Sequence, residues 1–155
     1  MFMSNDEIAS FFLEDLQVGQ SASYERTISD ADVREFALIS GDSNPVHLDE
    51  AFAQTTRFKG RIVHGMLPVT FVSTVLGTKL PGAGAIFMGA SFRFKAPVRI
   101  GDTVVATCTV KEIGTKGRVS FDCTCSVGDT VVVEGDALVK VPSREPPEKA
   151  PSEKA

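Results

Sequence analysis

The hydrophobic positions of the chain predict helices in its first half and a run of strands after them. Residues 21–28 are predicted to form a first strand, and Ser29 follows with the side chain of an N-cap. Asp30 and Asp32 favour the positive end of a helix dipole, so a helix is predicted that Gly41 stops. Its apolar face consists of Val33, Phe36 and Ala37 at the spacing i, i+3, i+4.

Residues 65–79 predict a second helix, which is apolar on most sides and therefore buried. Pro68 falls in its first turn, where a missing N–H costs no hydrogen bond. A loop is expected at residues 42–47 and a short helix at residues 49–54. The apolar positions of the long helix are Met66, Leu67, Val69, Phe71, Val72, Val75 and Leu76.

Four further strands are predicted, at residues 85–94, 103–113, 118–126 and 130–141. Gly101-Asp102, the stretch 114–117 and Gly128-Asp129 separate them, and such turn residues indicate antiparallel neighbours. A buried helix followed by an antiparallel meander predicts a curved sheet wrapped around that helix. The expected fold class is therefore α+β.

Composition and charge agree with one globular domain. The chain has 155 residues, of which 43% are hydrophobic, enough to bury a core without metal or disulfide support. A net charge of −4 without a Lys/Arg cluster argues against nucleic acid, and no segment has the ~18 apolar residues of a membrane helix, so neither partner is expected. We expect a single domain at residues 1–141, and a disordered tail or linker at the proline-rich residues 142–155.

The three cysteines, Cys108, Cys123 and Cys125, lie in strand-like sequence. A Cys-x-Cys pair without a nearby histidine is a poor zinc motif, so they are interpreted as reduced core thiols. Reduced thiols, together with an N-terminus that does not resemble a signal peptide, predict a cytoplasmic location.

The chain has only two histidines, and both lie in segments with candidate chemistry. In residues 41–47 (GDSNPVH), Asp42 and His47 offer a carboxylate and an imidazole for proton transfer. In residues 62–66 (IVHGM), Gly65 begins the buried helix, whose first N–H groups suit a developing oxyanion. A metal site built on Asp42, His47 and His64 is not expected, because nothing in their spacing fixes a coordination geometry.

The stretch ISGDSNPVHLDEAFAQTTRFKGRIVHGM, followed by LPG and SFRFKAPVRIGDTV, resembles the MaoC-like (R)-specific enoyl-CoA hydratases of the hotdog fold. The resemblance covers residues 18–141 and implies a homodimer whose sheets join. It also implies that Asp42 and His47 are catalytic and that the N–H of Gly65 binds the thioester oxygen. Ser73 falls where the family has a supporting active-site serine.

The activity that the resemblance implies is reversible addition of water to trans-2-enoyl-CoA, which gives (R)-3-hydroxyacyl-CoA. Asp42 is expected to take the water proton, and His47 to orient the water and supply a proton to C2. No cofactor is expected, because coenzyme A is part of the substrate. His64 is interpreted as a support for the loop of residues 42–47, and Asn44, held extended by Pro45, as a brace for it.

Two other function classes remain open from the sequence. One is a non-catalytic hotdog module that binds acyl thioesters or mediates dimerisation, and the other is a hotdog thioesterase. An acyl carrier protein in place of coenzyme A, or a fused downstream domain, are further possible partners. Several basic residues in the middle of the chain are interpreted as solvated, with a phosphorylated ligand as the alternative: Arg93, Lys95, Arg99, Lys116 and Arg118.

Overall fold

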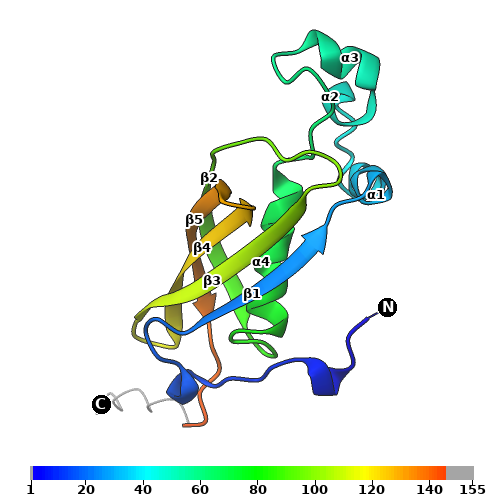
Figure 1. The fold of residues 1–155 in the computed structure, drawn as a ribbon. Helices are drawn as coiled ribbons and strands as arrows, with labels where there is room; N and C mark the ends of the chain where they lie inside the picture. The colour runs from blue at the N-terminus through cyan, green and yellow to red at the C-terminus, as the bar shows by residue number, and fades with distance from the viewer. Residues whose placement is uncertain (1, 146–155) are drawn as a thin grey trace, which may run out of the picture.

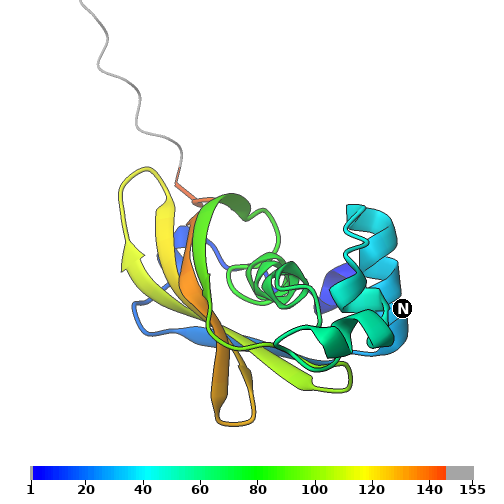
Figure 2. The same ribbon diagram turned by 90° about the horizontal axis from the view of Figure 1, so that it is seen from above.

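A five-stranded antiparallel sheet curves around one long helix, α4 (Met66–Thr78) (Figure 1). The computed structural model describes residues 2–145. Seen from above, the sheet encloses α4 on its concave side, and three shorter helices lie together beyond one end of the sheet (Figure 2). The predicted α+β architecture is confirmed.

The elements begin and end within one residue of their predicted bounds. The strands are β1 (Ser21–Thr27), β2 (Ile86–Phe94), β3 (Thr103–Ile113), β4 (Arg118–Val127) and β5 (Thr130–Lys140). The shorter helices are α1 (Asp30–Ser40), α2 (Pro45–Leu48) and α3 (Glu50–Thr55), and two 3₁₀ turns, Asn5–Glu7 and Leu13–Asp15, precede the sheet. Of these helices, α2 is the one that the sequence did not predict.

The order of the strands, β1-β3-β4-β5-β2, corrects one prediction. The turn at Gly101-Asp102 was expected to make β2 and β3 neighbours, but β2 pairs with β5 at the far edge. Gly101 N–H donates to the carbonyl of Ile28 at 2.7 Å, and Ile28 N–H donates to that of Asp102 at 3.0 Å. These hydrogen bonds hold the start of β3 beside the end of β1, its actual neighbour. Turn residues mark only where the chain changes direction, and they do not specify which strands pair.

Helix α1 has the capping that its sequence predicts. The Ser29 hydroxyl accepts from Asp32 N–H at 3.1 Å, and the Asp32 carboxylate accepts from Ser29 N–H at 2.9 Å, which forms a capping box. Gly41 ends the helix with φ +79°, a left-handed conformation that glycine adopts without strain. The two ends of α1 thus fix where the chain enters the segment containing Asp42.

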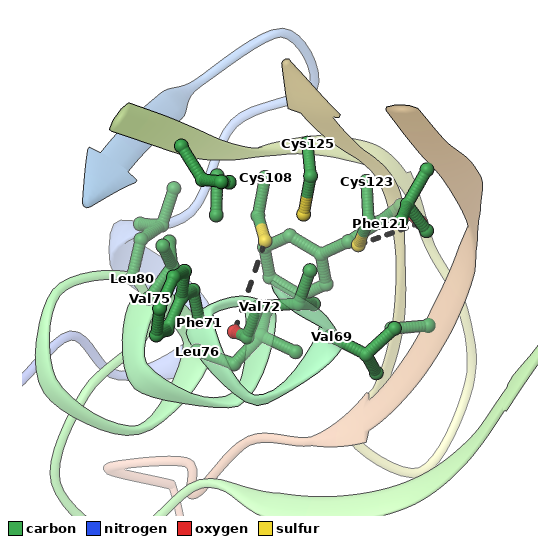
Figure 3. Close-up of a cluster of buried hydrophobic side chains, with 14 of the residues drawn as sticks. Val69, Phe71, Val72, Val75, Leu76, Leu80, Cys108, Phe121, Cys123 and Cys125 are labelled. Carbon is green, nitrogen blue, oxygen red and sulfur yellow. Dashed lines mark hydrogen bonds between the residues drawn. The ribbon is translucent and has the colours of Figure 1, made fainter. Parts of the chain in front are cut away.

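The core lies between the concave face of the sheet and α4. Figure 3 shows Phe121 and the three cysteines directed from the strands toward the helix, and all four are almost completely buried. The cysteines form no disulfide, and burial raises the pKa of the Cys125 thiol to about 12. They are buried packing groups, which agrees with their interpretation as reduced core thiols.

The first residues of the predicted tail lie against the N-terminal segment. Pro142 accepts a hydrogen bond from Leu13 N–H at 2.9 Å, and Arg144 forms a bidentate ion pair with Asp15 at 2.8 Å. Residues 146–155 lie outside the described part of the chain, so the division at residue 141 stays a prediction. Among the described helices, none has the length and apolar character needed to cross a membrane.

Candidate active site

His47 lies on a helical turn, α2, where the sequence predicted a loop. The side chain of Asn44 accepts a hydrogen bond from Val46 N–H at 3.2 Å and so caps this turn. Pro45 occupies the first helical position, where its fixed φ favours a helix. The capping residue Asn44 and the following Pro45 were visible in the sequence. A helix of only four residues is, however, too short to show a helical repeat of apolar positions.

The Asp42–His47 pair has the geometry of two hydrogen-bond acceptors that face one another. Nδ1 of His47 lies 2.9 Å from the carbonyl oxygen of Ile62, and because a carbonyl only accepts, Nδ1 carries the hydrogen. In the neutral ring Nε2 is then an acceptor, and it lies 4.0 Å from Oδ2 of Asp42. One water making hydrogen bonds of about 2.8 Å can donate to both atoms at once.

Burial holds the pKa of His47 below its ordinary value, and the neighbouring His64 acts in the same direction. The hydrogen bond to Ile62 and the carboxylate of Asp42 oppose this shift but do not reverse it. His47 is therefore neutral at pH 7, with Nε2 free to accept a proton. Asp42 is half exposed, and its Oδ1 accepts from Asn44 N–H at 3.2 Å, which orients the carboxylate.

His64 lies directly beneath this pair. Its ring stacks on that of His47 with a centroid distance of 3.9 Å, and its Nε2 lies 2.9 Å from the carbonyl oxygen of Asp42. Phe36 from α1 packs on the other side at 4.9 Å. His64 thus contacts both His47 and the backbone of Asp42.

The start of α4 provides N–H groups beside the pair. Gly65 is the N-cap of the helix, and within residues 2–145 neither its N–H nor that of Met66 has a hydrogen-bond acceptor. Leu67 N–H, by contrast, already donates to His64 at 3.0 Å. Gly65 also lies under the ring of Phe94, where an added Cβ would come within 3.0 Å of the ring.

A cavity of about 230 Å³ is lined by His47 and Gly65, whereas Asp42 is not among its lining residues. His47, His64 and Gly65 line it on one side, and apolar residues of the β2–β3 connection line it on the other. Two exposed cations, Arg57 and Lys95, also line it and so mark where the cavity meets solvent. Lys95 is one of the basic residues that the sequence offered for a phosphorylated ligand, whereas Arg57 belongs to no motif and could not be found from the sequence.

Two other arginines, Arg61 and Arg99, bind α1, α2 and the segment that follows α3. Arg61 donates to the carbonyl of His47 at 2.6 Å and to Asp30 at 2.7 Å. Arg99 donates to the carbonyl of Phe58 at 2.6 Å and to that of Gly60 at 3.1 Å. Arg99 is therefore not a free cation for a phosphate, and the sequence carried no signal for either role because the partners are backbone carbonyls.

Within one chain, the structure does not bring Ser73 to the Asp42–His47 pair. Ser73 lies two turns further along α4 than Gly65 and is exposed beside a separate cavity of about 90 Å³. Leu76 and Phe87 line that second cavity with it.

Ligand atoms of Asp42, His47 and His64 lie within 4.8 Å of one another, which raises the question of a metal. Two of the imidazole nitrogens are already hydrogen-bonded to carbonyl oxygens, and Nδ1 of His64 is enclosed. The carboxylate of Asp42 and Nε2 of His47 remain, fewer than the three protein ligands typical of a catalytic zinc site. The arrangement fits a bound water better than a metal ion.

A curved antiparallel sheet around a buried helix, with an Asp–His pair beside the helix start, is the arrangement of a hotdog-fold protein. Residues 14–134 match the MaoC-like domain, and the chain belongs to that family. An (R)-specific enoyl-CoA hydratase of Rhodospirillum rubrum is 54% identical over 143 residues, which cover 92% of this chain and 99% of the relative. A 3-hydroxybutyryl-CoA dehydratase of Methylorubrum extorquens is 49% identical, and that match covers 90% of this chain and 89% of the relative.

A solved structure of an (R)-hydratase from A. caviae involved in PHA biosynthesis has the same fold, with a TM-score of 0.81. It is 42% identical, and the match covers 83% of this chain and 99% of that one. The predicted family and the hotdog fold are therefore confirmed.

Proposed function

We propose that this protein is an (R)-specific enoyl-CoA hydratase, which adds water reversibly across the double bond of trans-2-enoyl-CoA. The observation that carries the proposal is the 4.0 Å separation of two acceptors, Oδ2 of Asp42 and Nε2 of His47, beside the cavity. The named relatives act in the two directions of this reaction, and both names specify a CoA thioester.

The proposed chemistry needs only these side chains and one water. As the water oxygen bonds to C3, its proton passes into the Asp42–His47 pair, and the pair returns a proton to C2. Because Nε2 carries no hydrogen in the resting ring, His47 supplies C2 only after the pair has received the water proton. Each such acid–base group contributes about 10²–10⁴-fold.

Electrons that leave the double bond collect on the thioester oxygen, where the free N–H groups of Gly65 and Met66 can donate to it. The partial positive charge at the start of α4 acts in the same direction. Asn44 and His64 act in this proposal by holding the segment that carries Asp42 and His47. A supporting role for Ser73 in the active site rests on the family resemblance.

The assay for this proposal mixes the purified protein with crotonyl-CoA and follows loss of the conjugated enoyl-thioester absorbance. A dehydrogenase specific for (R)-3-hydroxyacyl-CoA, added in excess, reports the stereochemistry. We expect rapid loss with a coupled signal. Release of free thiol would identify a thioesterase instead, and binding of enoyl-CoA without turnover would identify a binding module.

Two cations at the cavity mouth support a phosphate-bearing carrier at the thioester end of the substrate. Arg57 forms no ion pair within residues 2–145, and Lys95 shares Glu134 with Arg93 at 3.5 and 3.6 Å. Lys95 and Arg93 therefore share a single carboxylate, in a chain whose net charge is −4. Arg57 and Lys95 are therefore proposed to attract the phosphate that ends the pantetheine arm of coenzyme A or of an acyl carrier protein.

A series of crotonyl thioesters tests this assignment: pantetheine, phosphopantetheine, coenzyme A and acyl carrier protein. Arg57→Gln/Lys95→Gln should raise KM for the phosphate-bearing thioesters and leave the pantetheine thioester unaffected. Arg118→Gln is the matched control, because Arg118 pairs with Lys140, seven residues along β5 from Val133 at the cavity, or about 23 Å. An equal change for all four thioesters would contradict the phosphate contact.

A homodimer is proposed as the working unit. Strand β2 is the last strand of the sheet, so one of its edges is unpaired, and it exposes Ile86, Phe87 and Met88. Such an edge is a template for pairing with a second copy. Light scattering should give twice the monomer mass of 16.6 kDa. The unpaired core thiols support the cytoplasmic location that was predicted.

A further inference from the structure

His64 is almost completely buried, yet it contacts both members of the Asp42–His47 pair. Its Nε2 lies 2.9 Å from the main-chain carbonyl of Asp42, and because a carbonyl only accepts, Nε2 carries the hydrogen. Its ring stacks on His47 at 3.9 Å with an interplanar angle of 29°. One side chain therefore restrains the backbone that carries the carboxylate and the plane of the imidazole.

The second ring nitrogen of His64, Nδ1, makes no hydrogen bond within residues 2–145, so it does not explain why a histidine stands here. In the neutral ring Nδ1 is an acceptor, and within residues 2–145 it has no hydrogen-bond partner. The atom is enclosed, so a substrate in the cavity does not reach it. Leaving a buried polar atom without a partner is unfavourable, and an apolar ring of the same shape would avoid it. The hydrogen bond donated by Nε2 is what distinguishes histidine from phenylalanine here.

We infer that His64 is a positioning residue, which holds Asp42 through the Nε2–H hydrogen bond and holds the ring of His47 by stacking. Because Nδ1 of His47 is fixed independently by Ile62, the stacked ring removes the remaining freedom of the imidazole to tilt. Together these contacts fix the separation at which the two acceptors share one water. This inference rests on the proposed hydratase function.

Two substitutions separate the two contacts. His64→Gln keeps an N–H that can reach the Asp42 carbonyl but removes the ring. His64→Phe keeps a ring that can stack on His47 but removes the donor. Val33→Ala is the matched control, since Val33 is fully buried in α1 and does not line the cavity.

The kinetic expectation is a change in kcat without a change in KM, because the enclosed Nδ1 of His64 offers the substrate no hydrogen bond. His64→Phe should lower kcat about 10-fold or more, since small displacements of reacting groups are costly. His64→Gln should recover a large part of that loss, and Val33→Ala should lower the melting temperature without altering kcat. Equal kcat values for the Gln and Phe variants, or a raised KM with normal kcat, would overturn the inference.

A second measurement does not depend on activity. Each His64 variant retains a single histidine, so one ¹H–¹³C NMR titration reports His47 alone. Its pKa should rise in both variants, because His64 is one of the groups that lower it. The charged and titratable side chains around His47 are otherwise unchanged: Asp42, Arg61 and, across the cavity, Arg57 and Lys95.

An unchanged His47 pKa in both variants would mean that His64 does not act on His47, and it would overturn the inference. If the wild-type protein hydrates no enoyl thioester but the titration shifts as expected, the proposed function fails and the positioning role stands.

Discussion

Nε2 of His47 lies 4.0 Å from Oδ2 of Asp42, and the hydrogen bond from Nδ1 to Ile62 leaves Nε2 without a hydrogen. The two atoms therefore repel rather than bond to one another, and a donor must lie between them. Water is the smallest molecule that can donate to both.

Asp42→Asn should keep the fold but lower kcat by about 10²-fold or more, which is the usual effect of removing one acid–base group. The amide retains an oxygen for Asn44 N–H but cannot take a proton from water. Crotonyl-CoA turnover measures the loss. Asp129→Asn, in the β4–β5 turn away from the cavity, is the control and should be silent; normal turnover by the Asp42 variant would remove that carboxylate from the mechanism.

The acid limb of the kcat/KM profile should have its midpoint below pH 6.5. Burial lowers the pKa of His47 below 6.5, so the neutral, accepting form persists to lower pH than in a free histidine. Activity is thus complete above that lowered pKa and is lost as the pH falls through it. A profile measured from pH 4.5 to 8 tests this, and an acid midpoint at or above 6.5 would mean that His47 is not the titrating base.

Gly65→Ala should reduce kcat/KM about 10-fold or more, because its Cβ would lie 3.0 Å from the Phe94 ring and shift the wall of the cavity. Adding Phe94→Leu to this variant relieves the contact. Partial recovery in the double variant would assign the effect to the ring. If Gly65→Ala alone turns over normally with an unchanged melting temperature, the thioester does not approach this helix start.

Phe121→Ala should lower the free energy of unfolding by about 3–5 kcal/mol, the usual range for a fully buried phenylalanine. Phe121 is completely buried between β4 and α4 (Figure 3). Urea denaturation followed by circular dichroism gives the value. Val131→Ala, at a partly exposed position of β5, should change it by less than about 0.5 kcal/mol, and equal losses for the two variants would place Phe121 outside the core.

Sequence signals from neighbouring residues were sufficient to predict most helices and strands, as α1 shows. Ser29, Asp32 and Gly41 make their capping contacts with residues at most four positions away, so the helix bounds follow from the sequence nearby. The α2 turn was missed because its signal is confined to the Asn44 cap and Pro45. Pairing of β2 with β5 was missed because strand partners are chosen by packing across the core, which no turn residue encodes.

The candidate site divides in the same way. Asp42, His47 and Gly65 belong to short motifs whose spacing is visible in the sequence. The role of Arg99 at the backbone carbonyls of Phe58 and Gly60 is not visible, because any exposed arginine looks alike until the loop folds over it. The same holds for Arg57, which acquires meaning only from the cavity it lines.

The sequence by itself determined the elements, the α+β class and the residues that can move a proton, since these depend on neighbours within a few positions. The tertiary structure decided which nitrogen of His47 is free, because the Ile62 carbonyl lies fifteen residues away. It also decided that His64, seventeen residues from His47, lies beneath its ring. Residues this far apart in the sequence meet only when the chain folds and brings α2 against the segment that begins α4.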